Sequence, residues 1–591
     1  MDDSTACIFK KFSWDVSGLI ADIKQGQIGL PDIQRPFVWT DAQVRDLFDS
    51  MFQGYPVGML LFWEASTAAK VIGTTQKQMS PAHLIIDGQQ RLTSLYAVIT
   101  GEQVLDKNKR PRSIEIAFQP HTGKFEVRGA IQDRDPTWIP SISQIFKKQA
   151  NSWLLIEGFL NTQREVQGKL DEEKIGSISN NMMRLLHLLH YDFSVLEINS
   201  ATDEEVVAKI FVRVNSQGQK LKQSDFIFTL MSVYWNEGRE AIEKFCEDAR
   251  TPSKHGNSPY NYFISPEPDD LLRVSICLAF RRGRLKYAYQ ILTGKDLKTK
   301  KVSPEMKDEQ FAKLERAQAV VLDLHHWKNF LACVHAAGFR SRDMISSKAS
   351  LIYTYVFYLI GRQDYGLSHD DLQAHMARWF FMVSLSGRYT SNAEGQIEAD
   401  MADLEELKTG KDFLSYMDKA IRDTLTDDFW DITLINNLAS STASSPAQFA
   451  YWAALVLLDA WALFSTNKLG EQFDAVMNGK HNALEKHHLF PKAYLQKLGI
   501  TGVRKTNQLA NLAMIPWAKN LKISSKPPSM YFPLLVKAFP QQDKLEEHLR
   551  QHALPKGWEQ MEYDEFLQKR RGMMAKIIKE GFDLLNQGVK I

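Results

Sequence analysis

A chain of 591 residues is too long to fold around a single hydrophobic core, and this length is the strongest constraint that the sequence sets. Hydrophobic cores stop growing at about 250 to 300 residues, beyond which chains divide into domains. The hydrophobic content of 44% and the charged content of 24% are ordinary for a folded protein and exclude a disordered chain. We therefore expect an α+β multidomain protein of roughly three to four domains.

Membrane segments and disulfides are not indicated by the sequence. The first residues, MDDSTACIFKKF, contain no apolar run of the kind that signal peptides have. The longest apolar stretch, 451–464, contains Asp459 and is shorter than the ~20 residues that a bilayer requires. The four cysteines lie far apart without a CxxC pair, so neither a disulfide framework nor a zinc knuckle is indicated. We expect a cytoplasmic protein without a membrane partner.

The periodicity of hydrophobic residues changes along the chain. Strand and helix patterns alternate up to about residue 110, short strands follow to about 145, and helical patterns dominate from about 165 to 435. The segment NLASSTASS at 437–445 is small and polar, as linkers are. The expected divisions are a mixed α/β domain at 1–190, a mainly helical domain at 191–436, a linker at 437–449 and a helical C-terminal domain at 450–591.

Basic side chains are concentrated in one part of the C-terminal domain. Residues 480–526 contain nine lysines and arginines and one acidic residue, Glu485, although the whole chain has 72 basic and 70 acidic residues. Phosphate contacts with double-stranded DNA are the natural use of such a local excess. The residues that we assign to DNA binding are Lys486, Lys492, Arg504, Lys505, Lys519, Lys522 and Lys526.

Four residues of the same region form a candidate catalytic set: His487, His488, Asn511 and Asn520. Phosphodiester hydrolysis needs a base that deprotonates water and a divalent cation that stabilises charge on the leaving oxygen. In this interpretation His488 is the base, while His487 and Asn520 bind the metal. Asn511 orients the base or stabilises the loop. Residues 508–515 read as a turn into a strand, and 517–523 as the short helix that presents Asn520.

The competing interpretation is that His487 and His488 are only a polar pair at the end of a strand. For two adjacent histidines alone that interpretation is favoured, but the two asparagines and the basic surroundings reverse the preference. The other histidines have no such neighbours, and we interpret them as surface or helix-packing residues: His187, His190, His325, His326, His481, His548 and His552.

The runs HHLFP, NLAMI and AKNLKISSKPP resemble the ββα-metal (HNH-type) nuclease module at the C-terminus of GmrSD-type restriction enzymes. His488, Asn511 and Asn520 match that pattern residue by residue, and so does the nine-residue step between the asparagines. The chain departs from it at His487, where many relatives have an aspartate. Imidazole is a softer ligand than carboxylate, so the departure moves the expected cofactor from Mg²⁺ towards Mn²⁺, Co²⁺ or Ni²⁺.

A second constellation lies in the N-terminal domain, in the segments LPDIQRPFVW at 30–39 and IDGQQRLTSL at 86–95. In the second segment an apolar strand ends in a glycine turn at the start of a helix. Exposed backbone N–H groups there favour an anion, and Arg91 adds a forked positive charge. Asp87 is suited to a cation, and Gln89 and Gln90 to orienting water or contacting a base. The structural alternative is a tight turn closed by an Arg91–Asp87 pair.

Both segments resemble the ParB-like sensor domain of GmrSD-type and phosphorothioate-sensing defence enzymes, as do YPVG at 55–58, LFW at 61–63 and IFVRVNSQGQKL at 210–221. The resemblance runs from about Ile23 to Leu230, weakens through the helices and resumes at about Lys480. It implies that a nucleoside triphosphate, GTP or ATP, is bound and hydrolysed at the turn. The implied nucleotide-binding residues are Asp87, Gly88, Gln89, Gln90 and Arg91, with Gln34 and Arg35 nearby.

The leading hypothesis is a modification-dependent restriction endonuclease of antiphage defence, in which the N-terminal domain senses modified DNA and controls the nuclease through nucleotide hydrolysis. Phe37, Trp39 and Tyr55 are expected in the core, with a pocket for a modified DNA group as the alternative. Two other functions remain open. They are a DNA-binding regulator with a degenerate nuclease module, and a stand-alone nucleotide hydrolase that acts on protein partners. A homo-oligomer is compatible with each of these functions.

Overall fold

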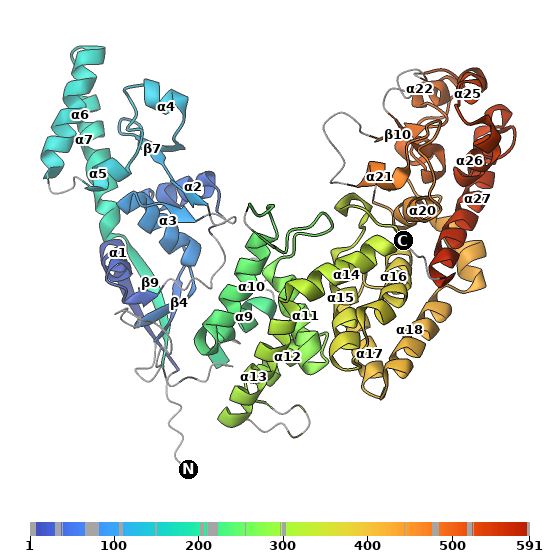
Figure 1. The fold of residues 1–591 in the computed structure, drawn as a ribbon. Coiled ribbons are helices and arrows are strands. Elements are labelled where there is room, and N and C mark those ends of the chain that lie inside the picture. Colours follow the sequence, from blue (N-terminus) through green and yellow to red (C-terminus); the bar gives the residue numbers. More distant parts are fainter. Residues whose placement is uncertain are drawn as a thin grey trace. The chain divides into compact units, whose positions relative to one another are not determined.

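The computed structural model of the chain consists of two compact units, an N-terminal unit at Met1–Val233 and a C-terminal unit at Tyr234–Ile591 (Figure 1). The boundaries that the sequence suggested at 190, 436 and 449 stay predictions. The structure describes residues 8–29, 37, 39–64, 82–105, 110–147, 151–200, 202, 206–207, 210, 223–254, 256–295, 297, 299, 303–442, 444–474, 484–516, 523 and 525–587.

The N-terminal unit is built on a five-stranded mixed sheet with the order β1–β9–β3–β4–β2. β1 (Phe9–Asp15) is antiparallel to β9 (Asp192–Ile198), which is parallel to β3 (Leu60–Glu64). β3 is antiparallel to β4 (His83–Asp87), and β4 is parallel to β2 (Ile28–Gly29). Side chains alternate between the two faces of the sheet. Leu60 and Phe62 therefore join the main core, whereas Leu61 and Trp63 join a small cluster on the other face.

Several helices contribute apolar faces to the main core, among them α1 (Val16–Lys24), α2 (Asp41–Phe52) and α3 (Gln89–Thr100). α2 begins at a capping box, in which the Thr40 hydroxyl accepts the Gln43 N–H at 3.3 Å and the Gln43 side chain accepts the Thr40 N–H at 2.9 Å. Phe37 is buried, Trp39 packs partly against this core, and Tyr55 is 60% exposed. The expectation of a core position is therefore confirmed for Phe37 and wrong for Tyr55.

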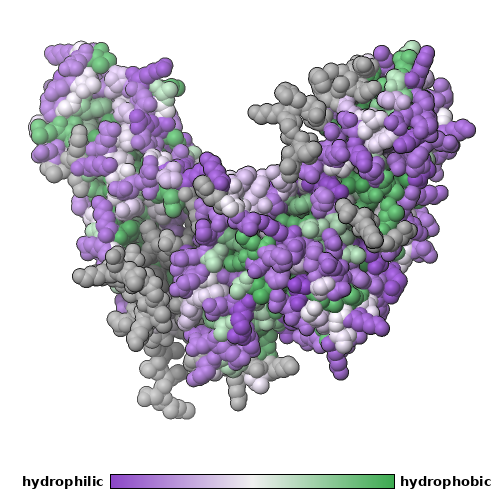
Figure 2. Space-filling model, viewed as in Figure 1, coloured by the Kyte–Doolittle hydropathy of each residue, from purple (hydrophilic) through white to green (hydrophobic). Residues whose placement is uncertain are grey.

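Short hairpins and helices complete the N-terminal unit. β5 (Val104–Leu105) pairs with β6 (Pro111–Arg112), and β7 (Ile116–Gln119) pairs with β8 (Lys124–Val127). Figure 2 shows apolar surface over the α6–α7 pair, where Trp153 is 71% and Leu154 is 64% exposed. The helices are α4 (Ala130–Arg134), α5 (Ser143–Lys147), α6 (Ser152–Gln167), α7 (Glu172–His187), η2 (Leu188–His190) and α9 (Gln223–Tyr234), the last of which reaches the boundary between the units.

The secondary structure of this unit agrees with the sequence patterns except at β9. The short strands expected between 111 and 145 are confirmed by β6, β7 and β8. The expectation of helix from about 165 onward is wrong for β9, which lies between β1 and β3. The alternation of buried Phe193 and Val195 with more exposed neighbours fits a strand, but pairing with two distant strands decides the structure.

The first part of the C-terminal unit is helical throughout its described secondary structure. α15 is buried on all sides from Ser350 to Gly361, because α11, α14 and α16 pack around it. The helices are α10 (Asn236–Asp248), α11 (Pro268–Phe280), α12 (Leu285–Leu292), α13 (Pro304–Val321), α14 (Leu324–Ala336), η4 (Arg342–Met344), α15 (Lys348–Gln363), α16 (His369–Ser386), α17 (Ala393–Leu404), α18 (Gly410–Thr424), η5 (Phe429–Thr433) and α19 (Leu434–Asn437).

The last part of this unit holds a two-stranded antiparallel sheet of β10 (Leu484–His488) and β11 (Leu512–Pro516). α20 packs against α27 so closely that a Cβ on Gly581 would lie 2.6 Å from Ala454 Cα. The coarse fold class is confirmed as a small N-terminal sheet with a helical remainder. The helices are α20 (Pro446–Leu457), α21 (Leu469–Phe473), α22 (Lys492–Lys497), α23 (Val503–Thr506), η6 (Leu509–Asn511), α25 (Pro528–Lys537), η7 (Gln542–Lys544), α26 (Leu545–Gln551), η8 (Trp558–Gln560), α27 (Tyr563–Leu584) and η9 (Leu585–Gln587).

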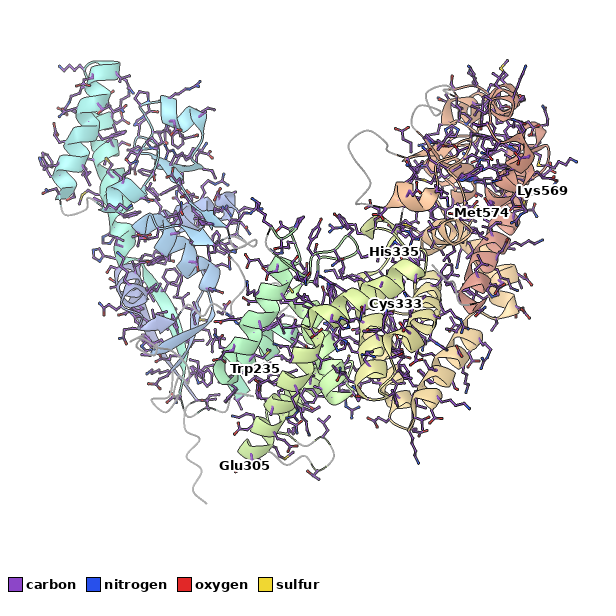
Figure 3. All side chains as sticks on the ribbon, in the orientation of Figure 1. Trp235, Glu305, Cys333, His335, Lys569 and Met574 are labelled. Carbon is purple, nitrogen blue, oxygen red and sulfur yellow. The ribbon has the colours of Figure 1, made fainter. Side chains whose placement is uncertain are left out.

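The described cysteines are free thiols. Cys246, Cys277 and Cys333 are buried, and burial raises the pKa of each thiol to about 12. Figure 3 labels Cys333 on α14, two positions before His335. Thiols of this kind stay protonated and are poor nucleophiles. In the part of the chain that the structure describes, none of the helices has the length and apolar character needed to cross a bilayer.

Candidate active site

The β10–β11 sheet brings the two ends of the C-terminal candidate site together. His488 is the last residue of β10 and lies opposite Leu512, and His487 lies opposite Ala513. The chain leaves β10 through Leu489 and Phe490 and then enters α22. The strand expected after residue 508 is confirmed as β11, which follows the turn of η6. Ile523 is helical and buried, whereas Asn520, Lys519 and Lys522 lie outside the described residues.

Asn511 stabilises the loop that follows His488. Its side chain is fully buried, and its Oδ1 accepts the Phe490 N–H at 2.8 Å. Its Nδ2 donates to the carbonyl oxygens of Phe490 and Thr506, both at 3.0 Å. The Asn511 carbonyl also accepts the Leu489 N–H at 2.8 Å. The amide is engaged on all sides by backbone, so within this structure it acts as a positioning residue.

Side chains from distant helices hold the same loop. Arg570 of α27 is fully buried and donates from Nη1 to the carbonyls of Ala510 and Leu512 at 2.8 and 2.9 Å. The Tyr531 hydroxyl of α25 donates to the Leu489 carbonyl at 2.6 Å. Sequence patterns identified neither residue, because each contact joins segments at least 42 positions apart.

The His488 ring is half-buried, and within the described part of the chain its hydrogen-bond partner is the side chain of Asn507. Its Nε2 lies 3.0 Å from Asn507 Oδ1, and an amide oxygen can only accept. Nε2 therefore carries the proton in the neutral ring, and Nδ1 keeps a lone pair. Burial lowers the pKa of His488, the hydrogen bond with Asn507 raises it to a smaller extent, and the charge of Lys492 lowers it further. The ring is thus neutral at physiological pH.

His487 has the donor chemistry for a divalent metal, but its ring is buried in the module. His487 is 5% exposed. Its ring packs edge to face against the Tyr531 ring, with 6.1 Å between the ring centroids. Adjacent residues of a strand point to opposite faces, so His487 and His488 are not arranged as a pair on one side of β10. Among the described residues no group of three or more His, Cys, Asp and Glu is placed to hold a metal ion.

The basic residues of this region divide into exposed and engaged cations. Five exposed basic residues form no ion pair with another described residue: Lys492, Lys497, Arg504, Lys505 and Lys526. Lys486 instead places its Nζ 5.0 Å from the centre of the Trp452 ring, and burial lowers its pKa, while the charge of Asp343 raises it. The local positive charge expected from the sequence is therefore present beside β10 and α22.

The N-terminal candidate site has the predicted strand, turn and helix. β4 ends at Asp87, Gly88 adopts φ 99°, and α3 begins at Gln89. A Cβ at Gly88 would lie 2.3 Å from Leu60 Cδ2, so glycine is needed here for space as well as for its positive φ. The α3 N-terminus has no side-chain cap. Gln34 and Arg35 lie outside the described residues.

Arg91 is held by two partners within the turn. Its Nη2 donates to Asp87 Oδ2 at 3.2 Å, and its Nη1 donates to the Val57 carbonyl at 2.8 Å. Its side chain is 14% exposed, and burial lowers its pKa more than the charge of Asp87 raises it. The Arg91–Asp87 pair of the structural alternative is therefore present. The sequence did not indicate the contact with Val57.

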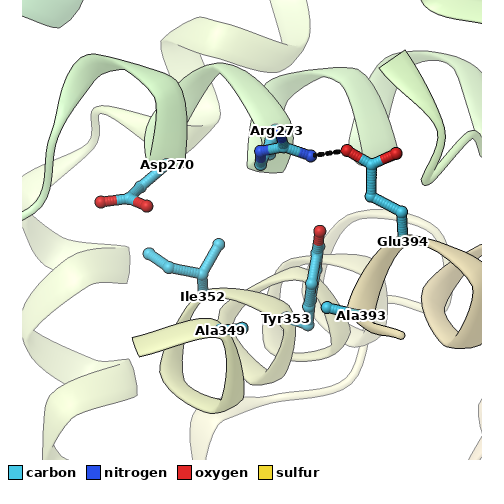
Figure 4. A pocket seen from close by; sticks show the side chains of 7 residues that line it. All are labelled: Asp270, Arg273, Ala349, Ile352, Tyr353, Ala393 and Glu394. Atoms are coloured by element: carbon cyan, nitrogen blue, oxygen red, sulfur yellow. Dashed lines mark hydrogen bonds and ion pairs between the residues drawn. The ribbon is translucent and has the colours of Figure 1, made fainter. Parts of the chain in front are cut away.

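A pocket of about 250 Å³ lies in the helical part of the C-terminal unit (Figure 4). Arg273 of α11 and Tyr353 of α15 point towards it. The Arg273 guanidinium already contacts Glu394 at 2.5 Å and Asp269 at 3.1 Å. Because both partners are carboxylates, they compensate the positive charge of Arg273, and the pocket is poorly suited to an anion. Its lining consists of Asp270, Arg273, Ala349, Ile352, Tyr353, Ala393 and Glu394.

Comparison with known proteins relates the chain to a protein family and to a protein of similar length. Residues 16–232 match the family model of the GmrSD restriction endonuclease, N-terminal domain, which supports a GmrSD-type family. An uncharacterized protein of Methanocaldococcus jannaschii is 21% identical over 565 residues, which are 88% of this chain and 87% of that protein. The family match contains the Asp87–Arg91 turn and ends before β10, so the His488 site lies outside the matched range.

Proposed function

We propose that this chain is a DNA endonuclease in which His488 is the general base of phosphodiester hydrolysis. The observation that carries the proposal is the arrangement of the His488 ring, which is neutral, held at Nε2 by Asn507 and left with a lone pair at Nδ1. A histidine takes a proton as a general base only from its neutral form, and it must be held in place to do so. The match of residues 16–232 to a restriction-endonuclease domain supports the same role.

In the proposed reaction, His488 Nδ1 removes a proton from the water that attacks phosphorus, and the bond to the leaving oxygen breaks. Asn507 holds the ring through Nε2, and Asn511 and Arg570 hold the loop behind it. A divalent cation, Mg²⁺ or Mn²⁺, would supply charge stabilisation at the leaving oxygen, with Asn520 as a proposed ligand. The buried His487 ring, on the other face of β10 from His488, does not fit the role of second ligand that the sequence suggested. The proposed substrate is double-stranded DNA that carries a modification. The exposed basic side chains beside β10 are proposed to bind its phosphates.

The first test is a supercoiled-plasmid assay with the full chain in Mg²⁺, in Mn²⁺ and in EDTA. We expect nicked or linear product with at least one of the metals and none in EDTA, because the charge on the leaving oxygen is otherwise uncompensated. Modified and unmodified plasmids are compared side by side. An intact plasmid in every condition, together with salt-dependent DNA binding, would favour the regulator with a degenerate nuclease module. The burial of His487 is the observation that keeps this second function open.

We further propose that the turn at Asp87–Arg91 binds and hydrolyses a nucleoside triphosphate, GTP or ATP, and that this controls cleavage. The α3 N-terminus has no side-chain cap, and a helix N-terminus with free N–H groups favours phosphate. Gly88 adopts φ 99°, which lets the chain turn from β4 directly into this helix N-terminus. Gln89 and Gln90 follow at the first positions of α3, and Gln34 and Arg35 complete the proposed set.

Replacing Arg91 by lysine tests the nucleotide site. Lysine keeps the charge and loses the forked contacts, so we expect nucleotide hydrolysis to fall about tenfold or more. Arg112→Lys is the matched control, because Arg112 also joins a carboxylate, Asp41 at 2.6 Å, to a backbone carbonyl, that of Trp39 at 3.2 Å. Equal hydrolysis by both variants, with a lower melting temperature for Arg91→Lys alone, would show that Arg91 only stabilises the turn.

A further inference from the structure

Four polar side chains meet where α14, α15 and α16 adjoin in the C-terminal unit (Figure 1), and we call them the α14–α16 donor cluster: His326, Tyr358, Arg362 and His369. His326 lies in the first turn of α14, and His369 is the first residue of α16. Tyr358 and Arg362 are four positions apart near the end of α15, so they share one face. The Tyr358 ring is 6.3 Å from the His326 ring and 6.2 Å from the His369 ring between centroids.

One atom of each residue is buried without a hydrogen bond of ordinary geometry to any described residue, although the Asn329 side chain interacts with the Tyr358 hydroxyl and lowers its pKa: His326 Nδ1, Tyr358 Oη, Arg362 Nε and His369 Nδ1. Tyr358 is 0% exposed. A buried polar atom that has no partner costs about 1 to 3 kcal/mol, and most such atoms in folded proteins are satisfied. Four of them in one place therefore require a common explanation.

The four atoms can all act as donors. Arg362 Nε can only donate, and the Tyr358 hydroxyl and His369 Nδ1 are able to. His326 Nε2 accepts from the Gln363 side-chain nitrogen at 3.3 Å, so the proton of the neutral His326 ring is on Nδ1. A partner that bonds to all four atoms at once is therefore an acceptor.

The surrounding charges favour a negative acceptor. α14 has 13 residues and α16 has 18, and both helices begin at the cluster with the positive ends of their dipoles. Burial lowers the pKa of His326 and of His369, the nearby carboxylates Asp323 and Asp370 raise them, and Arg362 and His325 lower them. Asp323 is already engaged, because its Oδ1 accepts the N–H groups of His325 and His326 at 2.7 and 3.0 Å.

We propose that the α14–α16 donor cluster binds a phosphate-type oxyanion, either free phosphate or the terminal phosphate of a nucleotide. A tetrahedral oxyanion presents several lone pairs to donors that come from three helices. Arg362 keeps its Nη1 on the Leu367 carbonyl and offers Nε to the anion. This site is separate from the β10–β11 sheet and from the Asp87–Arg91 turn, so it does not depend on the proposed function.

The test uses sulfate as the probe, because it stays a dianion over the pH range in which histidine titrates. The melting temperature of the full chain is measured against sulfate concentration, with chloride at equal ionic strength as the reference. We expect sulfate to stabilise the protein more than chloride. The apparent affinity should rise between pH 8 and pH 6, because a bound anion raises the pKa of His326 and His369 and is bound more tightly by their protonated forms.

Two variants make the expectation specific. Tyr358→Phe removes only the hydroxyl and should weaken sulfate binding about tenfold. His369→Ala should weaken sulfate binding to the same extent. The matched controls are Tyr355→Phe, which loses the hydrogen bond to the Val321 carbonyl at 2.9 Å, and His375→Ala, whose ring faces Asp418 at 3.9 Å on the same helix as His369. The controls should keep the sulfate affinity of the natural chain, although Tyr355→Phe is less stable.

Equilibrium dialysis with radiolabelled inorganic phosphate and with ATP then separates the two sources of phosphate. Tyr358→Phe must weaken the binding of phosphate or of ATP, whereas Tyr355→Phe must weaken the binding of neither ligand. Equal affinities in the natural chain, Tyr358→Phe and His369→Ala would overturn the proposal, and so would sulfate that stabilises no better than chloride.

Discussion

Replacement of His488 by alanine is expected to lower the rate of plasmid cleavage by about 10³-fold, which is the contribution of a well-placed general base. The loss follows from the removal of the lone pair at Nδ1, which has no substitute in alanine. Folding should be little affected, because the ring is half-buried and its hydrogen bond within the described residues is the one to Asn507. The measurement is the first-order rate of nicking under saturating metal, with the melting temperature of the variant as the folding control.

Two further observations make the His488 experiment decisive. Free imidazole should restore part of the cleavage by His488→Ala, because it fills the space and supplies the base. In the natural chain the rate should rise with pH up to the lowered pKa of His488 and stay constant above it. Asn507→Ala removes the hydrogen bond that raises this pKa, so the midpoint of its profile should move to lower pH. Full-rate cleavage by His488→Ala would end the assignment.

Replacement of Asn511 by alanine is expected to destabilise the loop between β10 and α22 by about 3 to 5 kcal/mol. The change leaves the Phe490 N–H and the carbonyls of Phe490 and Thr506 buried without their partner. Alanine cannot replace any of these three hydrogen bonds. Because His488 immediately precedes this loop, cleavage should be lost together with the local structure.

Native-state hydrogen exchange measures this effect at the amides of Leu489 and Phe490. A chain of two compact units need not unfold in a single transition, so a local probe is preferable to a global unfolding curve. The matched control is Asn467→Ala in the same unit, where the residue is exposed and a change within about 0.5 kcal/mol is expected. Unchanged exchange at Leu489 and Phe490 in Asn511→Ala would show that the loop is held by Arg570 and Tyr531 alone.

The two substitutions distinguish the loss of a catalytic group from the loss of loop structure. His488→Ala should leave the exchange of the Leu489 and Phe490 amides close to that of the natural chain, whereas Asn511→Ala should accelerate it. The structure predicts that both variants lose cleavage. It also predicts that only His488→Ala keeps the slow amide exchange of the natural chain. If exchange also rose in His488→Ala, the role of the ring would be structural.

Local sequence was sufficient where one short segment decides the outcome. The apolar run before Asp87, the glycine at 88 and the periodic Leu92 and Leu95 indicated strand, turn and helix, and these are β4, the turn and α3. Residues 508–515 indicated a turn into a strand, which is confirmed as β11. Both places have a hydrophobic period and a residue suited to a turn. These two signals lie within a few positions of each other in the sequence, so a short segment is enough to predict the structure.

The sequence by itself determined that the chain is multidomain, that basic residues are concentrated around His488, and that Asp87 and Arg91 lie at a turn. Only the tertiary structure decided what each side chain touches. It places Asn507 on His488, Val57 on Arg91, and Arg570 of α27 on the loop of Asn511, and it pairs β9 with two strands distant in sequence. The physical reason is that a hydrogen bond or a strand pairing depends on distance in space, whereas periodicity records only which face of an element is apolar.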